Sequence, residues 1–150
     1  MATSRRISYK NVFMGKLRHG ADLLEELSEI CKKQDVQLGR VMVIGAVRKA
    51  CVGFYNQKKR EYKHVTINKP LEITNLTGNI SLKNRTPMVH AHVTLSDSSG
   101  KAYGGHLAPG TIVFACEWII ESFDGPAFER EFDQETGLPL WSMKDIASAP

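Results

Sequence analysis

This sequence of 150 residues has no closely spaced pair of cysteines and no long apolar run. Its three cysteines, Cys31, Cys51 and Cys116, lie singly in apolar runs without any Cys-x-x-Cys spacing, which is typical of small buried side chains in a reducing, intracellular setting. No eighteen apolar residues occur together, and the first six residues lead into a polar segment without the apolar core of a signal peptide. We therefore expect a cytoplasmic protein with no membrane contact.

Several enzyme motifs are missing as well. The sequence has no Gly-x-Ser-x-Gly turn, no phosphate-binding loop and no dinucleotide fingerprint, so none of these motifs supports catalysis. Internal repeats and low-complexity stretches are also absent. The length fits a single domain spanning residues 1–150 that buries its own core without disulfides.

Charge is unevenly distributed along the chain, although the net charge is only +4. Residues 1–69 hold 15 basic and 6 acidic residues, whereas residues 70–150 hold 5 and 10. This asymmetry fits a surface for a polyanion, a contact between unlike faces of neighbouring subunits, or an ordinary solvated surface.

One amphipathic helix and a curled sheet account for most of the chain. Apolar residues follow a helical period over residues 20–33, where Asp22 has the N-cap position and Lys32 and Lys33 fill the last turn. Strands are predicted over residues 41–47, 51–55, 61–67, 71–80 (bent near Gly78), 89–107 as a hairpin, and 111–123. These features predict an α+β fold with an antiparallel or mixed sheet of about seven strands beside one main helix. The segment from residue 124 is expected to wrap the surface or to dock on a neighbouring subunit, with Trp141 as its anchor.

Three histidines form the main candidate for a functional site. His90 and His92 are two residues apart in a strand and therefore point to the same face. A turn over residues 97–100 then brings His106 back across from them, while residues 104–105 are two glycines that form a bulge or allow a close backbone approach. Three neutral imidazoles with an open fourth position suit a divalent metal, zinc first. The alternative is that these histidines only make hydrogen bonds or lie at an interface.

Two acidic residues and one basic turn are the other candidates for functional residues. Glu72 and Glu117 lie in apolar strands and could assist a metal-bound water, and Glu117 in a central strand alternatively forms an ion pair with Arg40 or Arg48. The turn Lys58, Lys59 and Arg60 could contact nucleic-acid phosphates. His19 and His64 are expected to be surface or structural residues.

The order of these motifs resembles the PPC domain, the plants-and-prokaryotes-conserved domain, over about residues 13–123. The matching motifs are residues 18–24, 43–47, 71–73, 76–80, 90–93 and 104–107. The resemblance implies an α/β domain with a strongly curved, mostly antiparallel sheet that associates as a homotrimer. Prokaryotic members are commonly labelled predicted DNA-binding proteins, and some that carry the three histidines contain a metal. The resemblance to these members implies that His90, His92 and His106 are the metal ligands.

Three functions follow, in order. The first is a homotrimeric module that binds a divalent metal and serves assembly, ligand binding or regulation. The second is DNA binding through basic patches, although the Arg-Gly-Arg-Pro core of the AT-hook found in plant members is absent. The third is a metal-dependent hydrolase.

Overall fold

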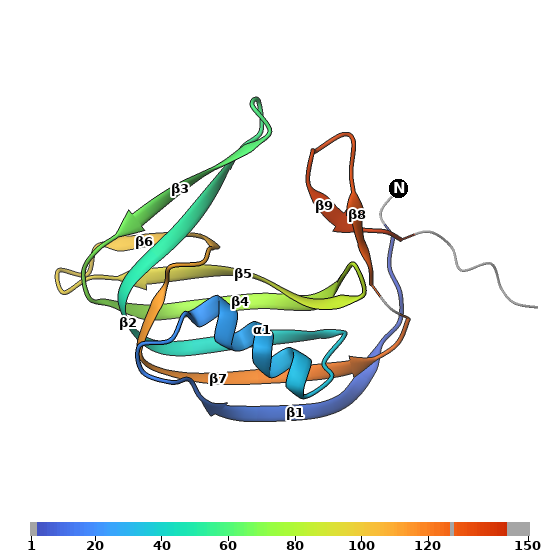
Figure 1. Cartoon of the computed structure of the whole chain (residues 1–150), viewed down its shortest axis with the longest axis horizontal. Helices are drawn as coiled ribbons and strands as arrows, with labels where there is room; N and C mark the ends of the chain where they lie inside the picture. The colour runs from blue at the N-terminus through green and yellow to red at the C-terminus, as the bar shows by residue number, and fades with distance from the viewer. Residues whose placement is uncertain (1–2, 127, 144–150) are drawn as a thin grey trace, which may run out of the picture.

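The computed structural model describes residues 3–126 and 128–143 and consists of one curved sheet, one helix and a small terminal hairpin (Figure 1). The sheet has seven strands in the order β1-β7-β2-β4-β5-β6, with β3 paired to β2, and every pairing in it is antiparallel. The elements are β1 (Ser8–Lys16), α1 (Leu23–Lys33), β2 (Gly39–Asn56), β3 (Glu61–Ile67), β4 (Leu71–Lys83), β5 (Thr86–Ser96), β6 (Ala102–Leu107), β7 (Ile112–Asp124), β8 (Arg130–Phe132) and β9 (Pro139–Trp141). The predicted fold class is confirmed.

The helix α1 covers one face of this sheet. Asp22 caps it by accepting hydrogen bonds from the backbone N–H groups of Leu24 and Glu25 at 3.0 and 3.1 Å, as the N-cap prediction requires. The buried side chains of the helix join the sheet residues in one hydrophobic core; they are Leu23, Leu27 and Cys31. In the part of the chain that the structure describes, no helix is long and apolar enough to cross a lipid bilayer.

Strand β2 is longer than the sequence suggests. The two strands predicted over residues 41–47 and 51–55 are one strand, Gly39–Asn56, because the register shifts near residues 43–49 bend it without ending it. Its first part pairs with β4 and β7, and its last part pairs with β3 and β6. Strand β4 likewise runs past the expected bend at Gly78 to Lys83, and its irregularity toward β5 lies between Ile73 and Asn75.

The segment after residue 124 folds back on its own chain. The short hairpin β8–β9 lies at one end of the sheet (Figure 1), where the backbone N–H of Leu82 donates to the carbonyl of Phe128 at 2.9 Å. Trp141 packs edge-on against Phe128 and donates its indole N–H to Ser81 Oγ at 3.0 Å. Trp141 therefore holds the hairpin against β4, which fits the expectation that this segment wraps the surface.

One row of directly opposed residues crosses the sheet on the face away from α1. Starting from β6, the row contains His106, His92, Thr77, Met42, Ile119 and Met14. Directly opposed residues share a face, and the neighbouring residues Val41, Val43 and Leu76 are buried in the core on the other face. The histidines and an apolar strip thus lie on the same side of the sheet.

Candidate metal centre

The three predicted histidines lie together on strands β5 and β6. His92 is directly opposite His106, and His90 lies two residues before His92 on the same face. Each side chain offers one nitrogen, and these nitrogens lie within 4.8 Å of one another. Nitrogens bound to one tetrahedral zinc lie about 3.4 Å apart, given bonds of about 2.0–2.1 Å. Modest side-chain rotation therefore closes the three imidazoles around one ion.

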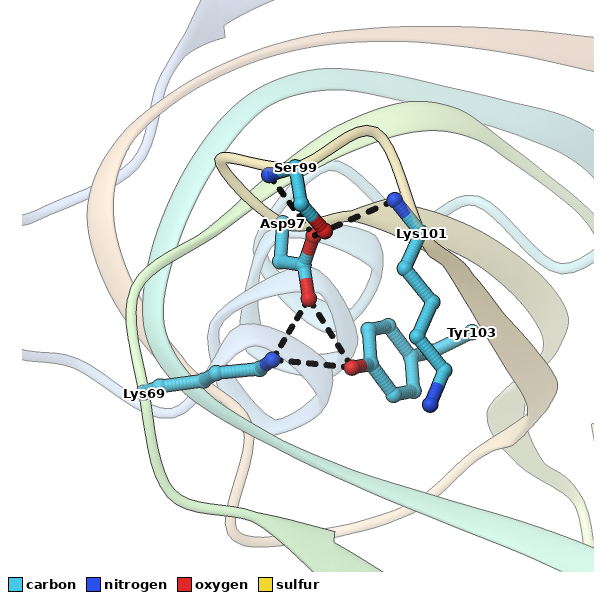
Figure 2. Close-up of polar contacts among 5 residues, drawn as sticks. All are labelled: Lys69, Asp97, Ser99, Lys101 and Tyr103. Carbon is cyan, nitrogen blue, oxygen red and sulfur yellow. Dashed lines mark hydrogen bonds and ion pairs between the residues drawn. The ribbon is translucent and has the colours of Figure 1, made fainter.

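The register that brings His106 opposite His92 depends on the turn between β5 and β6. In this turn, Asp97 Oδ1 accepts hydrogen bonds from the backbone N–H groups of Ser99 and Lys101 and from Ser99 Oγ, at 2.6–3.1 Å (Figure 2). Its Oδ2 accepts from Lys69 Nζ at 2.6 Å and from the Tyr103 hydroxyl at 2.9 Å. These bonds, Lys69 first, hold the pKa of Asp97 well below its usual range. One ionised carboxylate therefore fixes the turn and thereby the position of β6.

Glycines allow β6 to approach its neighbours. A Cβ at Gly105 would lie 2.7 Å from the carbonyl oxygen of Gly53 on β2, and one at Gly104 would lie 2.8 Å from the carbonyl oxygen of Val93 on β5. No register shift interrupts the β5–β6 pairing. Of the two predicted roles for this glycine pair, close approach is correct and a bulge is not.

The local environment favours the neutral form of His90 and His106. Burial lowers the pKa of His90 to about 4, assisted by the positive charge of Arg130 and by the other two histidines. Burial also lowers the pKa of His106. Neutral imidazole is the form that binds metal. His106 Nδ1 is buried and has no hydrogen-bond partner among the described residues, which fits a nitrogen that serves as a metal ligand.

Arg130 is the residue that the sequence analysis missed. It starts β8 and lies beside the histidines, with Nη2 at 3.3 Å from His90 Nδ1. Its guanidinium donates to Ser81 Oγ, the Pro139 carbonyl and Asn79 Oδ1 at 2.7–3.0 Å. Nothing local in the sequence marks this contact, because 40 positions separate Arg130 from His90.

The ring of Tyr62 borders the site on its β3 side. Its centroid lies 5.0 Å from that of His106 and 5.9 Å from that of His64. His64 is exposed and outside the group of three, as expected. His19 is exposed too and contacts the carbonyl of Phe114 through Nδ1 at 2.7 Å, so it also lies apart from the group.

Neither predicted acid joins the histidines. Glu72 is opposite Ser96 and five residues from Thr77, which places it about 16 Å along β4 from the row of the site at about 3.3 Å per residue. Glu117 lies on β7, three strands from β5, and is exposed, so the argument that its carboxylate is buried is wrong. The acid paired with Arg40 is Glu121. No carboxylate belongs to the three-histidine group among the described residues.

The predicted basic turn lies at the tip of the β2–β3 hairpin. Lys58 and Lys59 are exposed there, and Asn56 Oδ1 accepts from the backbone N–H groups of both. Arg60 instead donates to the carbonyls of Gln134 and Glu135 at 3.1 and 3.0 Å. The arginine therefore ties the β2–β3 hairpin to the β8–β9 loop.

Comparison with known proteins identifies the fold. The family model of the Plants and Prokaryotes Conserved (PCC) domain, also written PPC, matches residues 5–124. The chain belongs to this domain family. The match confirms the resemblance found in the sequence and extends it slightly at the N-terminal side.

Several solved structures are closely similar to this chain. A metal-containing protein of Archaeoglobus fulgidus is 38% identical with a TM-score of 0.90, and the alignment covers 94% of this chain and 99% of that one. A PPC protein of Pyrococcus horikoshii is 30% identical with a TM-score of 0.89, covering 97% and 100%. A proposed DNA-binding protein of Bacteroides thetaiotaomicron is 27% identical with a TM-score of 0.83, covering 93% and 99%.

Among curated proteins, this chain is similar to the bifunctional protein GlmU of Synechococcus sp. (strain JA-2-3B'a(2-13)). It is 30% identical over 138 residues, which are 90% of this chain and 20% of that protein. The chain thus spans about a fifth of the length of the curated relatives that it matches.

Proposed function

We propose that this PPC-domain protein binds one divalent metal ion, zinc first, through His90, His92 and His106. The observation that carries the proposal is that strands β5 and β6 bring three imidazoles together with their nitrogens within 4.8 Å of one another. Zinc prefers nitrogen ligands of this kind, and three protein ligands leave a fourth position for another group. The similar protein of Archaeoglobus fulgidus contains a metal, which supports the same assignment here.

The metal would serve ligand binding, assembly or regulation. Metal-assisted hydrolysis would also require an acid or base near the metal-bound water. Glu72 and Glu117, the two acids predicted for that task, lie elsewhere on the sheet. The open metal position therefore favours capture of a ligand over hydrolysis.

Titration of metal-free protein with zinc, against a chelating dye, tests this proposal. One site per chain is expected, and His106→Ala should weaken binding by more than the roughly 10- to 100-fold that is typical of losing an outer-shell partner. His19→Ala is the matched control, because His19 lies apart from the three-histidine group, and it should bind like the wild type. Equal zinc affinity in the His106→Ala variant would contradict the site.

We also propose that the chain associates as a homotrimer, as its family implies. Exposed apolar side chains support this, because Met14 and Met42 lie in the cross-sheet row that begins at the histidines, with exposed fractions of 74% and 39%. Exposed apolar strips of this kind mark association surfaces. Light scattering should give a mass near three chains, and Met14→Glu with Met42→Glu should yield monomers. A wild-type monomer at micromolar concentration would contradict the proposal.

DNA binding is the second candidate function. The exposed Lys58 and Lys59 at the hairpin tip favour it, as do structural neighbours with proposed DNA-binding roles. Filter binding against salt concentration tests it with Lys58→Gln and Lys59→Gln together, while Arg60 is left intact because it holds the β8–β9 loop. The double variant should bind more weakly and show a shallower salt dependence. Negligible affinity of the wild type at low salt would exclude this function.

A further inference from the structure

Arg130 is a buried cation at the edge of the three-histidine site, and no acidic side chain among the described residues pairs with it. The residue is 8% exposed. Its hydrogen-bond partners are neutral: Ser81 Oγ, the Pro139 carbonyl, Asn79 Oδ1 and His90 Nδ1. The uncharged ring of Trp141 lies 5.6 Å from its Cζ. Burying a charge without a counter-charge is costly. The site thus has an unbalanced positive charge before any metal binds.

Metal binding would remove one of these partners. A guanidinium can only donate, so Arg130 Nη2 requires a lone pair on His90 Nδ1. If His90 binds the metal through Nδ1, the metal takes that lone pair. If His90 binds through Nε2, then Nδ1 carries the proton of the neutral ring and faces the arginine as a second donor. In either case an N–H of Arg130 is left without an acceptor.

The excess positive charge at the metal-loaded site also calls for an additional anionic group. A divalent ion would add two positive charges beside the guanidinium, and no carboxylate belongs to the histidine group among the residues described. An external anion supplies both the missing acceptor and the missing negative charge. An oxyanion suits this position, because one oxygen can take the open metal site while another accepts from Arg130.

We propose that the metal-loaded site captures a small oxyanion, a carboxylate or a phosphate, which bridges the metal and Arg130 Nη2. This inference rests on the proposed metal site and adds the class of its ligand. Arg130 is the residue that selects the anion. The side chains of Asn79 and Ser81, two residues apart on one face of β4, hold the guanidinium in place.

Cobalt(II)-loaded protein provides the test, because visible absorption reports the fourth ligand. Sodium acetate and inorganic phosphate are titrated separately, so the two series distinguish a carboxylate from a phosphate ligand. At least one anion should change the spectrum of the wild type at saturable concentration. Arg130→Gln should weaken that anion about 10- to 100-fold, the usual loss when a hydrogen bond to a charged group is deleted. Arg130→Lys should recover part of the affinity, because it restores the charge without the planar fork.

Two further measurements make the result decisive. Arg48→Gln, at an exposed arginine on β2, removes the same charge and should leave anion affinity unchanged. In the wild type and in Arg48→Gln, the anion should tighten cobalt binding by the same factor by which cobalt tightens anion binding, because linkage is reciprocal, and this factor should be smaller in Arg130→Gln. Cobalt bound with no anion effect, or equal anion affinity in Arg130→Gln, overturns this inference while the metal site stands. Failure to bind cobalt at all overturns the metal site itself.

Discussion

Arg130 Nη2 lies 3.3 Å from His90 Nδ1, although 40 positions separate the two residues in the chain. The contact joins the C-terminal hairpin to the histidine strand. It places a permanent positive charge beside an imidazole that would bind a cation, which opposes protonation of that imidazole. The arrangement therefore favours a neutral His90 and, once a metal is bound, an anionic ligand.

The pKa of His90 should be measurable by NMR titration of the metal-free protein. Burial and the Arg130 charge lower it to about 4, so His90 should stay neutral from pH 7 down to about pH 5. Arg130→Gln should raise this pKa toward 6.5 without reaching it, because burial remains. A His90 resonance that titrates near 6.5 in the wild type would contradict the described environment.

Zinc should stabilise the folded protein through the three histidines. A ligand that binds only the folded state at about 100 times its dissociation constant adds about 2.7 kcal/mol to the free energy of unfolding. Thermal unfolding of metal-free protein with and without zinc should therefore show a higher midpoint with zinc. His92→Ala should abolish this shift, whereas His19→Ala should keep it. An equal shift in His92→Ala would place the stabilising zinc elsewhere.

Gly105→Ala should damage the site through the backbone. The added Cβ would lie 2.7 Å from the carbonyl oxygen of Gly53, so β6 must move away from β2 and take His106 with it. Zinc affinity should fall at least about tenfold, and the protein should also lose stability, since forced overpacking typically costs about 1–3 kcal/mol. Chemical denaturation and zinc titration measure the two effects. Unchanged zinc affinity would mean that the β2–β6 contact does not position His106.

Asp97→Asn should loosen the turn that sets the β5–β6 register, and its effect should depend on pH. The folded pKa of Asp97 lies below its ordinary value of 3.8, chiefly because of Lys69, so its contribution is complete above about pH 4 and declines as the pH falls through the folded value. Wild type and variant should differ in the free energy of unfolding at pH 7, and the difference should shrink in acid. Asp124→Asn, at an exposed ion pair of 3.7 Å, is the control. A difference that grows in acid would contradict this account.

Local patterns in the sequence were sufficient to predict most of the fold and the grouping of the three histidines. Asp22 and the apolar period predicted the helix, and the alternation of His90 and His92 with a turn before His106 predicted the cluster. Both depend on contacts between residues close in sequence. The single long β2 and the position of Arg130 were not predicted, because they depend on pairings between distant segments that no local pattern records.

Metal content of the protein purified without chelator tests the central claim most directly. Elemental analysis should find about one divalent metal ion per chain in the wild type and none in the variant that combines His90→Ala with His92→Ala. Circular dichroism should confirm that the double variant is folded. A wild-type protein without metal that also takes up none from added zinc, or a folded double variant that keeps its full metal content, would contradict the three-histidine site.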